Sequence, residues 1–198
     1  MKKNILIALS IISVWFIFIR EEHVNLGPGV LAPETPVQVT IESPESFSFK
    51  DYTITPIATF NIKAKALSIE SYHSGRESDL SPVDFALGWG NMSDESILAA
   101  IDISQSNRWY RWHVEQFPIP RRDIETHSAN MHLIPANGYI ESMIDNTRTG
   151  DIVAISGALV KVDAQDGWQW SSSLTRTDTG NHACELVWVE QFEILSME

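Results

Sequence analysis

The chain has a single cysteine, few basic residues and, beyond its first 20 residues, no long hydrophobic run. Cys184 is the only cysteine among 198 residues, so the protein forms no internal disulfide and depends on a packed core for its stability. Lys and Arg number 14 against 26 Asp and Glu, a formal charge of −12. A surface of this sign repels phosphate backbones, which argues against nucleic acid as a partner. No H-E-x-x-H or C-x-x-C spacing is present, so we predict no metal and no cofactor.

The long apolar segment runs from Asn4 to Ile19, between two lysines and Arg20. Basic residues before an apolar core are typical of an export signal, but residues 16–19 are too bulky for a signal-peptidase site. We therefore predict an uncleaved anchor over residues 1–20, with the N-terminus inside the cell and the rest outside. A span normally needs about 20 apolar residues, and snorkelling of Lys3 and Arg20 can cover the deficit. The alternative is a signal peptide that is cleaved.

The anchor is followed by a segment that differs in composition from the rest of the chain. Residues 24–36 hold three of the nine prolines and two of the ten glycines, which predicts an extended tether over residues 21–36. Residues 37–198 then form one domain with a core of its own. Beyond the first 20 residues the chain carries 11 Lys and Arg against 26 acids, a formal charge of −15.

Within this domain the hydrophobic pattern favours strands over helices. Alternation of apolar and polar residues predicts strands at 37–41, 52–69, 108–112, 151–162, 168–173 and 184–194, with a break near Pro56 and a bend or bulge at Gly157. Cap residues and apolar spacing predict two short helices, at 93–101 and 138–147. We read residues 73–82 and 175–182 as polar loops. The expected fold class is α+β, a curled antiparallel sheet of OB-like or small-barrel type with two short helices, preceded by the transmembrane anchor.

Three groups of residues carry a resemblance to known sequences. They are Phe85-Ala-Leu-Gly-Trp-Gly90 with Met92-Ser-Asp94, Asn130-Met-His-Leu-Ile-Pro135, and Trp170-Ser-Ser-Ser-Leu-Thr-Arg176 with Asp178-Thr-Gly180 and Cys184-Glu185. Together they resemble a group of uncharacterised bacterial proteins that are anchored in the envelope. The resemblance covers residues 52–190 and carries no catalytic assignment. It implies a bacterial, envelope-located protein, and together with the predicted anchor this gives an inner-membrane protein with an extracytoplasmic C-terminal domain.

The residues best suited to metal binding or catalysis are histidines and the cysteine. His127, His132 and His182 could supply nitrogen ligands beside Cys184. A spacing of five residues does not place His127 and His132 on one helix face, so structural histidines are the better interpretation. Cys184 with a histidine could instead form a nucleophile–base pair, although its apolar surroundings favour a buried, inert thiol. We assign no catalytic residue, and whether the protein is an enzyme stays open.

Loops that pair polar side chains with small residues are the favoured place for a site. Three such loops are Trp89 to Asp94, His127 to His132 and Arg176 to His182. We predict that they converge at one rim of the sheet, and the ligand-binding residues would be Trp89, Asn130, His132, Arg176 and Asp178. Trp89 would form a wall and Arg176 would bind an anion. The predicted function is an envelope module that binds a partner protein or a small ligand. The alternative is a thiol- or metal-dependent hydrolase that uses Cys184 and a histidine.

Overall fold

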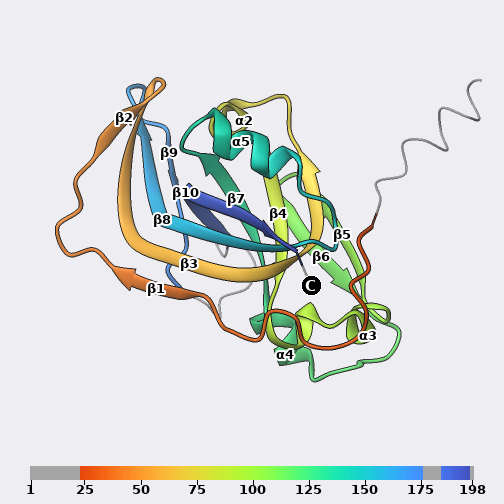
Figure 1. Cartoon of the computed structure of the whole chain (residues 1–198). Coiled ribbons are helices and arrows are strands. Elements are labelled where there is room, and N and C mark those ends of the chain that lie inside the picture. Colours follow the sequence, from red (N-terminus) through yellow and green to blue (C-terminus); the bar gives the residue numbers. More distant parts are fainter. Residues whose placement is uncertain (1–22, 176–183, 197–198) are drawn as a thin grey trace, which may run out of the picture.

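The computed structural model describes residues 23–175 and 184–196, and most of them lie in strands (Figure 1). The strands are β1 (Val37–Thr40), β2 (Phe47–Phe49), β3 (Tyr52–Ser71), β4 (Val83–Gly88), β5 (Asp102–Ser106), β6 (Trp109–His113), β7 (Ser128–Pro135), β8 (Ile152–Ala164), β9 (Gln169–Ser171) and β10 (Glu185–Leu195). The helices are α2 (Arg76–Leu80), α3 (Glu95–Leu98), α4 (Arg121–Thr126) and α5 (Gly138–Asp145), with the 3-10 helix η1 (Gly90–Ser93). The predicted α+β class is confirmed.

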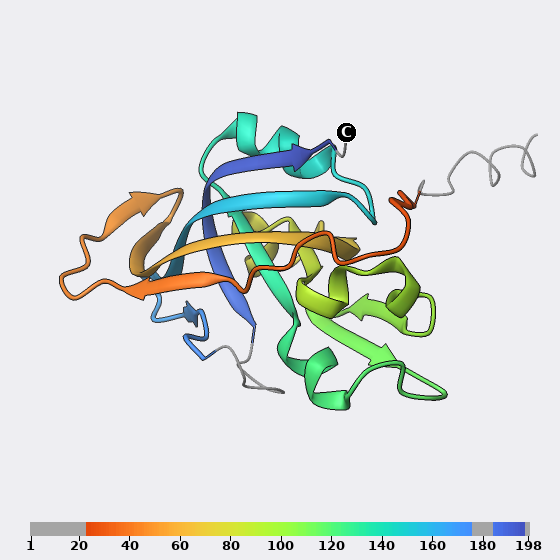
Figure 2. The same ribbon diagram turned by 60° about the horizontal axis from the view of Figure 1, so that its bottom comes forward.

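Five strands form a ring. β3 pairs with β4, β4 with β7, β7 with β10, β10 with β8, and β8 again with β3. Each pairing is antiparallel except that of β7 with β10, which is parallel. The ring closes because β3 is long enough to pair with β8 along its first part and with β4 along its last part. Figures 1 and 2 show these strands wrapping around a common interior, so the predicted curled antiparallel sheet is confirmed.

Alternate residues of the ring point inward and form the main core. The inward side chains include Phe60, Ile62, Phe85, Leu87, Met131, Leu133, Val153, Ile155, Val187 and Val189. Ile140 and Ile144 of α5 pack on the same core, because the helix presents these two residues on one face. Complete burial of a side chain of this size contributes about 1.5–3 kcal/mol. The interior of the ring therefore supplies much of the stability.

Irregular pairing lets the two longest strands curl. The β3–β8 register shifts between Pro56 and Ala58, so β3 bulges near Pro56 and continues, where the sequence predicted a break. The β8–β10 register shifts between Val189 and Gln191, opposite Gly157. A Cβ atom at Gly157 would lie 1.9 Å from the carbonyl oxygen of Trp188. Glycine is needed there because the two backbones approach so closely.

A separate hairpin covers the outside of the ring. β5 and β6 form a two-stranded sheet, whose inner side packs through Ile103 and Tyr110 on Ala86 of β4 and on Leu67 of β3. In Figure 2 this green hairpin lies on one side of the barrel and ends in an extended connection to α4. The hairpin thereby places its turn residues over the outer face of the ring.

Several elements differ from the predictions. β4 was not predicted, and residues 128–132, expected as part of a loop, belong to β7. Both strands are buried on both faces, so they lack the alternation that marks a half-exposed strand. The predicted helix at 93–101 is shorter, since α3 ends at Leu98 and β5 begins at Asp102. The short helices α2 and α4 are additional.

The N-terminal part of the predicted tether lies against the domain. Residues 23–32, here called the N-terminal strap, are extended, but the Gly29 amide donates to Asp94 Oδ1 and the Ala32 amide donates to Ser93 Oγ. Val24 donates to the carbonyl oxygen of Thr149. These bonds hold the strap to the domain because its amides find acceptors on Ser93 and Asp94, where η1 meets α3, and on Thr149, after α5. The prediction of a tether that lifts the domain away is therefore corrected for this stretch.

The predicted anchor, residues 1–20, lies outside the described residues. Within residues 23–175 and 184–196, no helix has the length and apolar character that crossing a membrane would require.

Candidate functional site

A buried charged pair lies on the outer face of the ring, where β4 meets β7. Asp84 alternates with the inward-facing Val83 and Phe85, so it points outward, and it stands directly opposite His132 in the register. His132 Nδ1 is 2.9 Å from Asp84 Oδ1, and both side chains are almost completely buried. A carboxylate in this position fixes the orientation of the imidazole ring.

The turn of the β5–β6 hairpin brings a guanidinium group to this pair. Arg108 Nη1 is 2.6 Å from Asp84 Oδ1, and the arginine side chain is 18% exposed. Asn107 and Arg108 have φ angles of 53° and 67°. Positive φ at both central residues is typical of a tight hairpin turn, whose second position usually holds glycine. An arginine there accepts a backbone conformation that costs about 1–3 kcal/mol.

Aromatic rings enclose the guanidinium group. Its central carbon lies 3.8 Å from the ring centroid of Tyr72 and 5.9 Å from that of Trp170. The Tyr72 hydroxyl also accepts a hydrogen bond from the Arg108 amide at 2.8 Å. Trp170, in β9, packs on the His132 ring with centroids 4.9 Å apart. The polar pair is thus flanked by half-buried rings from two loops that leave the barrel.

Amide side chains continue the polar network along β7. Asn130 Oδ1 accepts from Gln105 Nε2 at 2.6 Å, and Asn130 Nδ2 donates to the carbonyl oxygen of Arg108 at 3.2 Å. Asn130 Nδ2 also lies 3.9 Å from Cys184 Sγ. Cys184 forms no disulfide and is partly exposed. This network fixes the hairpin turn to the strand that carries His132.

Four buried polar atoms of this network have no hydrogen-bond partner among the described residues. They are the acceptors Asp84 Oδ2 and Gln105 Oε1, the donor Arg108 Nη2, and His132 Nδ1, whose close approach to Asp84 Oδ1 lacks hydrogen-bond geometry. Leaving a buried polar atom unpaired costs about 1–3 kcal/mol, so native proteins usually satisfy such atoms. One donor and two acceptors lie close together here, which is an arrangement that a ligand carrying both hydroxyl donors and acceptors would satisfy.

Two tyrosines next to the network stay protonated. Burial raises the pKa of Tyr72, although the hydrogen bond from the Arg108 amide acts in the opposite direction. Burial raises the pKa of Tyr110 to about 12, partly offset by its hydrogen bond with Ser128. Both hydroxyls therefore remain neutral hydrogen-bonding groups over the physiological pH range.

The structure brings together some of the predicted site residues. Asn130 and His132 lie side by side on the outer face of β7, within the network. Trp89 does not, because its ring is 2% exposed and belongs to the core inside the barrel. Its expected role as a wall is corrected. Arg176 and Asp178 lie outside the described residues. The described residues on either side of them are joined by a hydrogen bond, in which the Ser173 amide donates to the Cys184 carbonyl at 3.1 Å.

Sequence reasoning missed Asp84, Arg108 and Tyr72. Asp84 carried a readable signal, since a lone carboxylate in the run Val83-Asp84-Phe85-Ala86-Leu87 must find a partner if the strand is buried. Arg108 follows Asn107 where a hairpin turn would favour glycine. Tyr72 gave no signal, because only the fold places it beneath the hairpin turn.

Possible metal sites and similarity to known proteins are two further sources of information on function. Across the described residues, no three His, Cys, Asp or Glu side chains are grouped so that they could hold a metal ion. Comparison of the chain with protein-family models, curated proteins and solved structures finds no match.

Proposed function

We propose that this is a single-pass protein of the bacterial inner membrane whose extracytoplasmic domain binds a small saccharide ligand over the outer face of β4 and β7, beside Tyr72, Arg108 and Trp170. The observation that carries the proposal is the group of unpaired buried atoms on Asp84, Gln105 and Arg108, flanked by aromatic rings. Sugar hydroxyls both donate and accept hydrogen bonds, and the apolar faces of sugar rings pack on aromatic side chains.

The topology supports this location if the barrel is of the OB type, as we infer. Around the ring, its five strands follow the order β3, β4, β7, β10, β8. In chain order the strands are β3, β4, β7, β8 and β10, and α5 lies between the third and the fourth, β7 and β8. OB-folds bind oligonucleotides and oligosaccharides on the face of their second and third strands, next to the loops after strands 1 and 4. In this protein the second and third strands of the barrel are β4 and β7. Tyr72 begins the connection from β3 to β4, and Trp170 lies in the connection from β8 to β10, which includes β9.

Charge decides between the two ligand classes. A protein of formal charge −12 repels a polyanion, and its affinity for an oligonucleotide would depend on many basic contacts. Near the network, Arg108 is already neutralised by Asp84. A neutral or weakly charged oligosaccharide pays no such electrostatic penalty, so we favour it over a nucleic acid.

A glycan microarray that presents bacterial cell-envelope oligosaccharides tests the proposal, with the full-length protein in nanodiscs. We expect selective binding, and Arg108→Lys should weaken it by about tenfold or more, because a lysine cannot keep both the planar contact with Asp84 and the stacking on Tyr72. Arg111→Lys, on the same hairpin but exposed, is the matched control. Absence of selective binding by the folded protein, or equal effects of the two variants, would contradict the proposal.

The proposed membrane location needs its own experiment. We expect the protein to fractionate with inner membranes and to keep its first residues. N-terminal sequencing that finds a mature chain starting beyond residue 20 would show a cleaved signal peptide and overturn the anchor.

One observation favours a second candidate, a hydrolase that uses the Cys184 thiol. Asp84 contacts His132 Nδ1, which leaves Nε2 as the base nitrogen, as in catalytic triads. Cys184 lies beside Asn130 on the same strand face. Alkylation by iodoacetamide at neutral pH tests this candidate. A reactive thiol should alkylate fast and should slow down in His132→Gln, whereas the same slow rate in both proteins would exclude it.

A further inference from the structure

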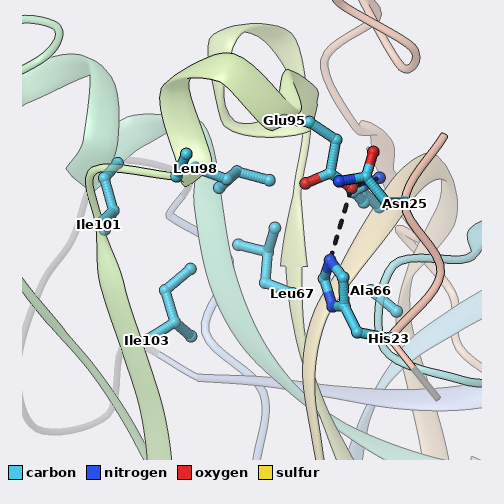
Figure 3. A pocket seen from close by; sticks show the side chains of 10 residues that line it. His23, Asn25, Ala66, Leu67, Glu95, Leu98, Ile101 and Ile103 are labelled. Atoms are coloured by element: carbon cyan, nitrogen blue, oxygen red, sulfur yellow. Dashed lines mark ion pairs between the residues drawn. The ribbon is translucent and has the colours of Figure 1, made fainter. Parts of the chain in front are cut away.

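A cavity of about 390 Å³ opens between β3, α3, the start of β5 and the N-terminal strap. Figure 3 shows its two unlike walls. The apolar wall is formed by Leu67, Leu98, Ile101 and Ile103, and the polar wall by His23, Asn25, Lys65 and Glu95. The volume is within the range of small-molecule sites, about 300–1,000 Å³. The cavity shares no lining residue with the network around Asp84.

A buried ion pair sets the chemistry of the polar wall. Lys65 is 0% exposed, and its Nζ lies 2.7 Å from Glu95 Oε1 and donates to the carbonyl oxygen of Gly150 at 3.0 Å. Lys65 cannot easily leave Glu95, because a buried cation without its partner is strongly destabilising. His23 Nε2 lies 3.6 Å from the same carboxylate oxygen.

An incoming ligand meets the acceptor of this ion pair, not its cation. Lys65 is 0% exposed and donates to the Gly150 carbonyl, whereas the Glu95 carboxylate, whose side chain is 11% exposed, only accepts hydrogen bonds. A ligand group that donates hydrogen bonds is favoured at Glu95, and an anionic group is repelled by it.

We propose that this cavity binds a small amphiphile, a single alkyl chain with an amine or hydroxyl head group. The chain packs against Leu67, Leu98, Ile101 and Ile103, and each methylene that it buries raises the affinity about fourfold. The head group donates to Glu95 beside Asn25. Binding at this cavity does not depend on saccharide binding at Arg108.

The same ligand chemistry could come from the membrane or from solution. In the proposed topology His23 follows Arg20, the end of the anchor, by three residues, which span at most about 11 Å. The cavity then lies at the bilayer surface, where amphiphiles are concentrated. This source rests on the proposed anchor, whereas the binding chemistry does not.

Photolabelling of the full-length protein in phosphatidylcholine nanodiscs tests the proposal. The probes are dodecylamine and dodecanoic acid, each with a terminal diazirine, and the labelled sites are mapped by peptide mass spectrometry. We expect the amine to label residues 95–103 and the acid to label them about tenfold less, because its head group faces Glu95. Equal or stronger labelling by the acid, or labels spread evenly over the domain, would overturn the proposal.

Two neighbouring alanines provide a matched pair of variants. Ala99 lines the cavity and Ala100 does not, and both are exposed, so a larger side chain at either position is compatible with the fold. Ala99→Trp fills the cavity and should lower amine labelling about tenfold, while Ala100→Trp should label like the wild type. Equal labelling of the two variants would contradict a ligand in this cavity.

The source is identified with a second probe, phosphatidylethanolamine that carries a diazirine near the end of its acyl chain and is built into the disc. Labelling of residues 95–103 by this lipid identifies a membrane source, and labelling by the free amine alone identifies a dissolved one. If neither probe labels these residues, the proposal is wrong.

Discussion

Arg108 combines a costly backbone conformation with a buried electrostatic role. Its φ of 67° is tolerated because the side chain contacts Asp84 and stacks on Tyr72. Strain of this kind persists where the surrounding structure stabilises it, and it is enriched at functional sites. The residue is therefore more informative about function than any other position of the hairpin.

For stability, we expect Arg108→Lys to lower the free energy of unfolding by about 1–3 kcal/mol, since a buried carboxylate loses its charge-assisted contact. Arg111→Lys should change it by less than about 0.5 kcal/mol, because Arg111 is exposed and bonds to Ser106 at the surface. Urea unfolding of both variants measures the difference. Similar values for the two would show that Asp84 does not depend on Arg108.

Tyr110 makes the stability sensitive to alkaline pH. Burial raises its pKa to about 12 in the folded protein, whereas an unfolded tyrosine titrates near pH 10. The stabilisation that arises from this pKa difference is complete below pH ~10. It is lost as the pH rises from there towards the pKa of Tyr110 in the folded protein, because the unfolded chain releases its proton first. We expect Tyr110→Phe to lose about 0.5–1.5 kcal/mol at pH 7, from the missing bond to Ser128. The same variant should make the free energy of unfolding fall less steeply between pH 9 and 11. An equally steep fall in the variant and the wild type would refute this explanation.

Individual residues of the site could be predicted from sequence only in part. Asn130 and His132 were found because polar side chains stood close together in the chain. Asp84 and Arg108 were missed because their partners are distant in sequence and meet only through β-pairing and the hairpin turn. Trp89 was misassigned, since the neighbouring glycines suggested an exposed ring that the barrel in fact buries.

Among the elements, the N-terminal strap depends on a few contacts with η1 and α3. Asp94 caps α3 by accepting from the Ser96 amide, and its carboxylate also accepts from the Gly29 amide. The hydrogen bonds from Ser96 and Gly29 lower the pKa of Asp94. A carboxylate with a lowered pKa stabilises the fold above its unfolded pKa, and this stabilisation is lost as the pH falls through the folded value.

We therefore expect Asp94→Asn to weaken the acid dependence of stability below pH ~4. At pH 7, Asp94→Ala should cost about 1 kcal/mol through loss of the helix cap. Hydrogen exchange of residues 23–32 should rise in the alanine variant, because the Gly29 amide loses its acceptor. Asp102→Asn, an exposed acid at the start of β5, is the control. Unchanged exchange in Asp94→Ala would mean that the strap is held elsewhere.

Prediction of elements succeeded for most half-exposed strands, although the short strands β2 and β5 were missed, and it failed where strands are buried on both faces. β3, β8 and β10 alternate clearly or carry long apolar runs, and all three were predicted. β4 and β7 are enclosed by the core on one side and by the hairpin or the polar network on the other. Their side chains carry no period of two, so the sequence pattern resembled a loop.

For the whole molecule, closure of the barrel depends on the close approach of β8 to β10. A Cβ atom at Gly157 would lie 1.9 Å from the Trp188 carbonyl oxygen. We therefore expect Gly157→Ala to lower the free energy of unfolding by about 2–4 kcal/mol, because the backbone must move. Gly138→Ala, where a Cβ atom meets nothing within 4 Å at the start of α5, should be neutral or stabilising by up to about 1 kcal/mol. Thermal unfolding compares the two. A small effect at Gly157 would indicate that the ring is not closed at this pair.

The fold class could be predicted from the sequence, because many strands, few helices and a strand with a glycine at an expected bulge favour a curled sheet. The ring order was not, since the parallel pairing of β7 with β10 joins segments about 50 residues apart. The site follows from that order, because it places the outer face of β4 and β7 beneath the hairpin turn and beside β9.

The most direct test of the central claim is NMR chemical-shift mapping with ¹⁵N-labelled side chains, using the oligosaccharide that the microarray selects. We expect saturating ligand to shift the ring nitrogens of His132 and the indole nitrogen of Trp170, and to leave those of His113 and Trp112 unchanged. The latter two lie at the end of β6 farthest from the Asn107–Arg108 turn, where His113 is exposed and Trp112 packs on Phe117. The Arg108→Lys variant should require about tenfold more ligand for the same shifts. Shifts confined to His113 and Trp112, or none at His132 and Trp170, would contradict a saccharide site on the face of β4 and β7.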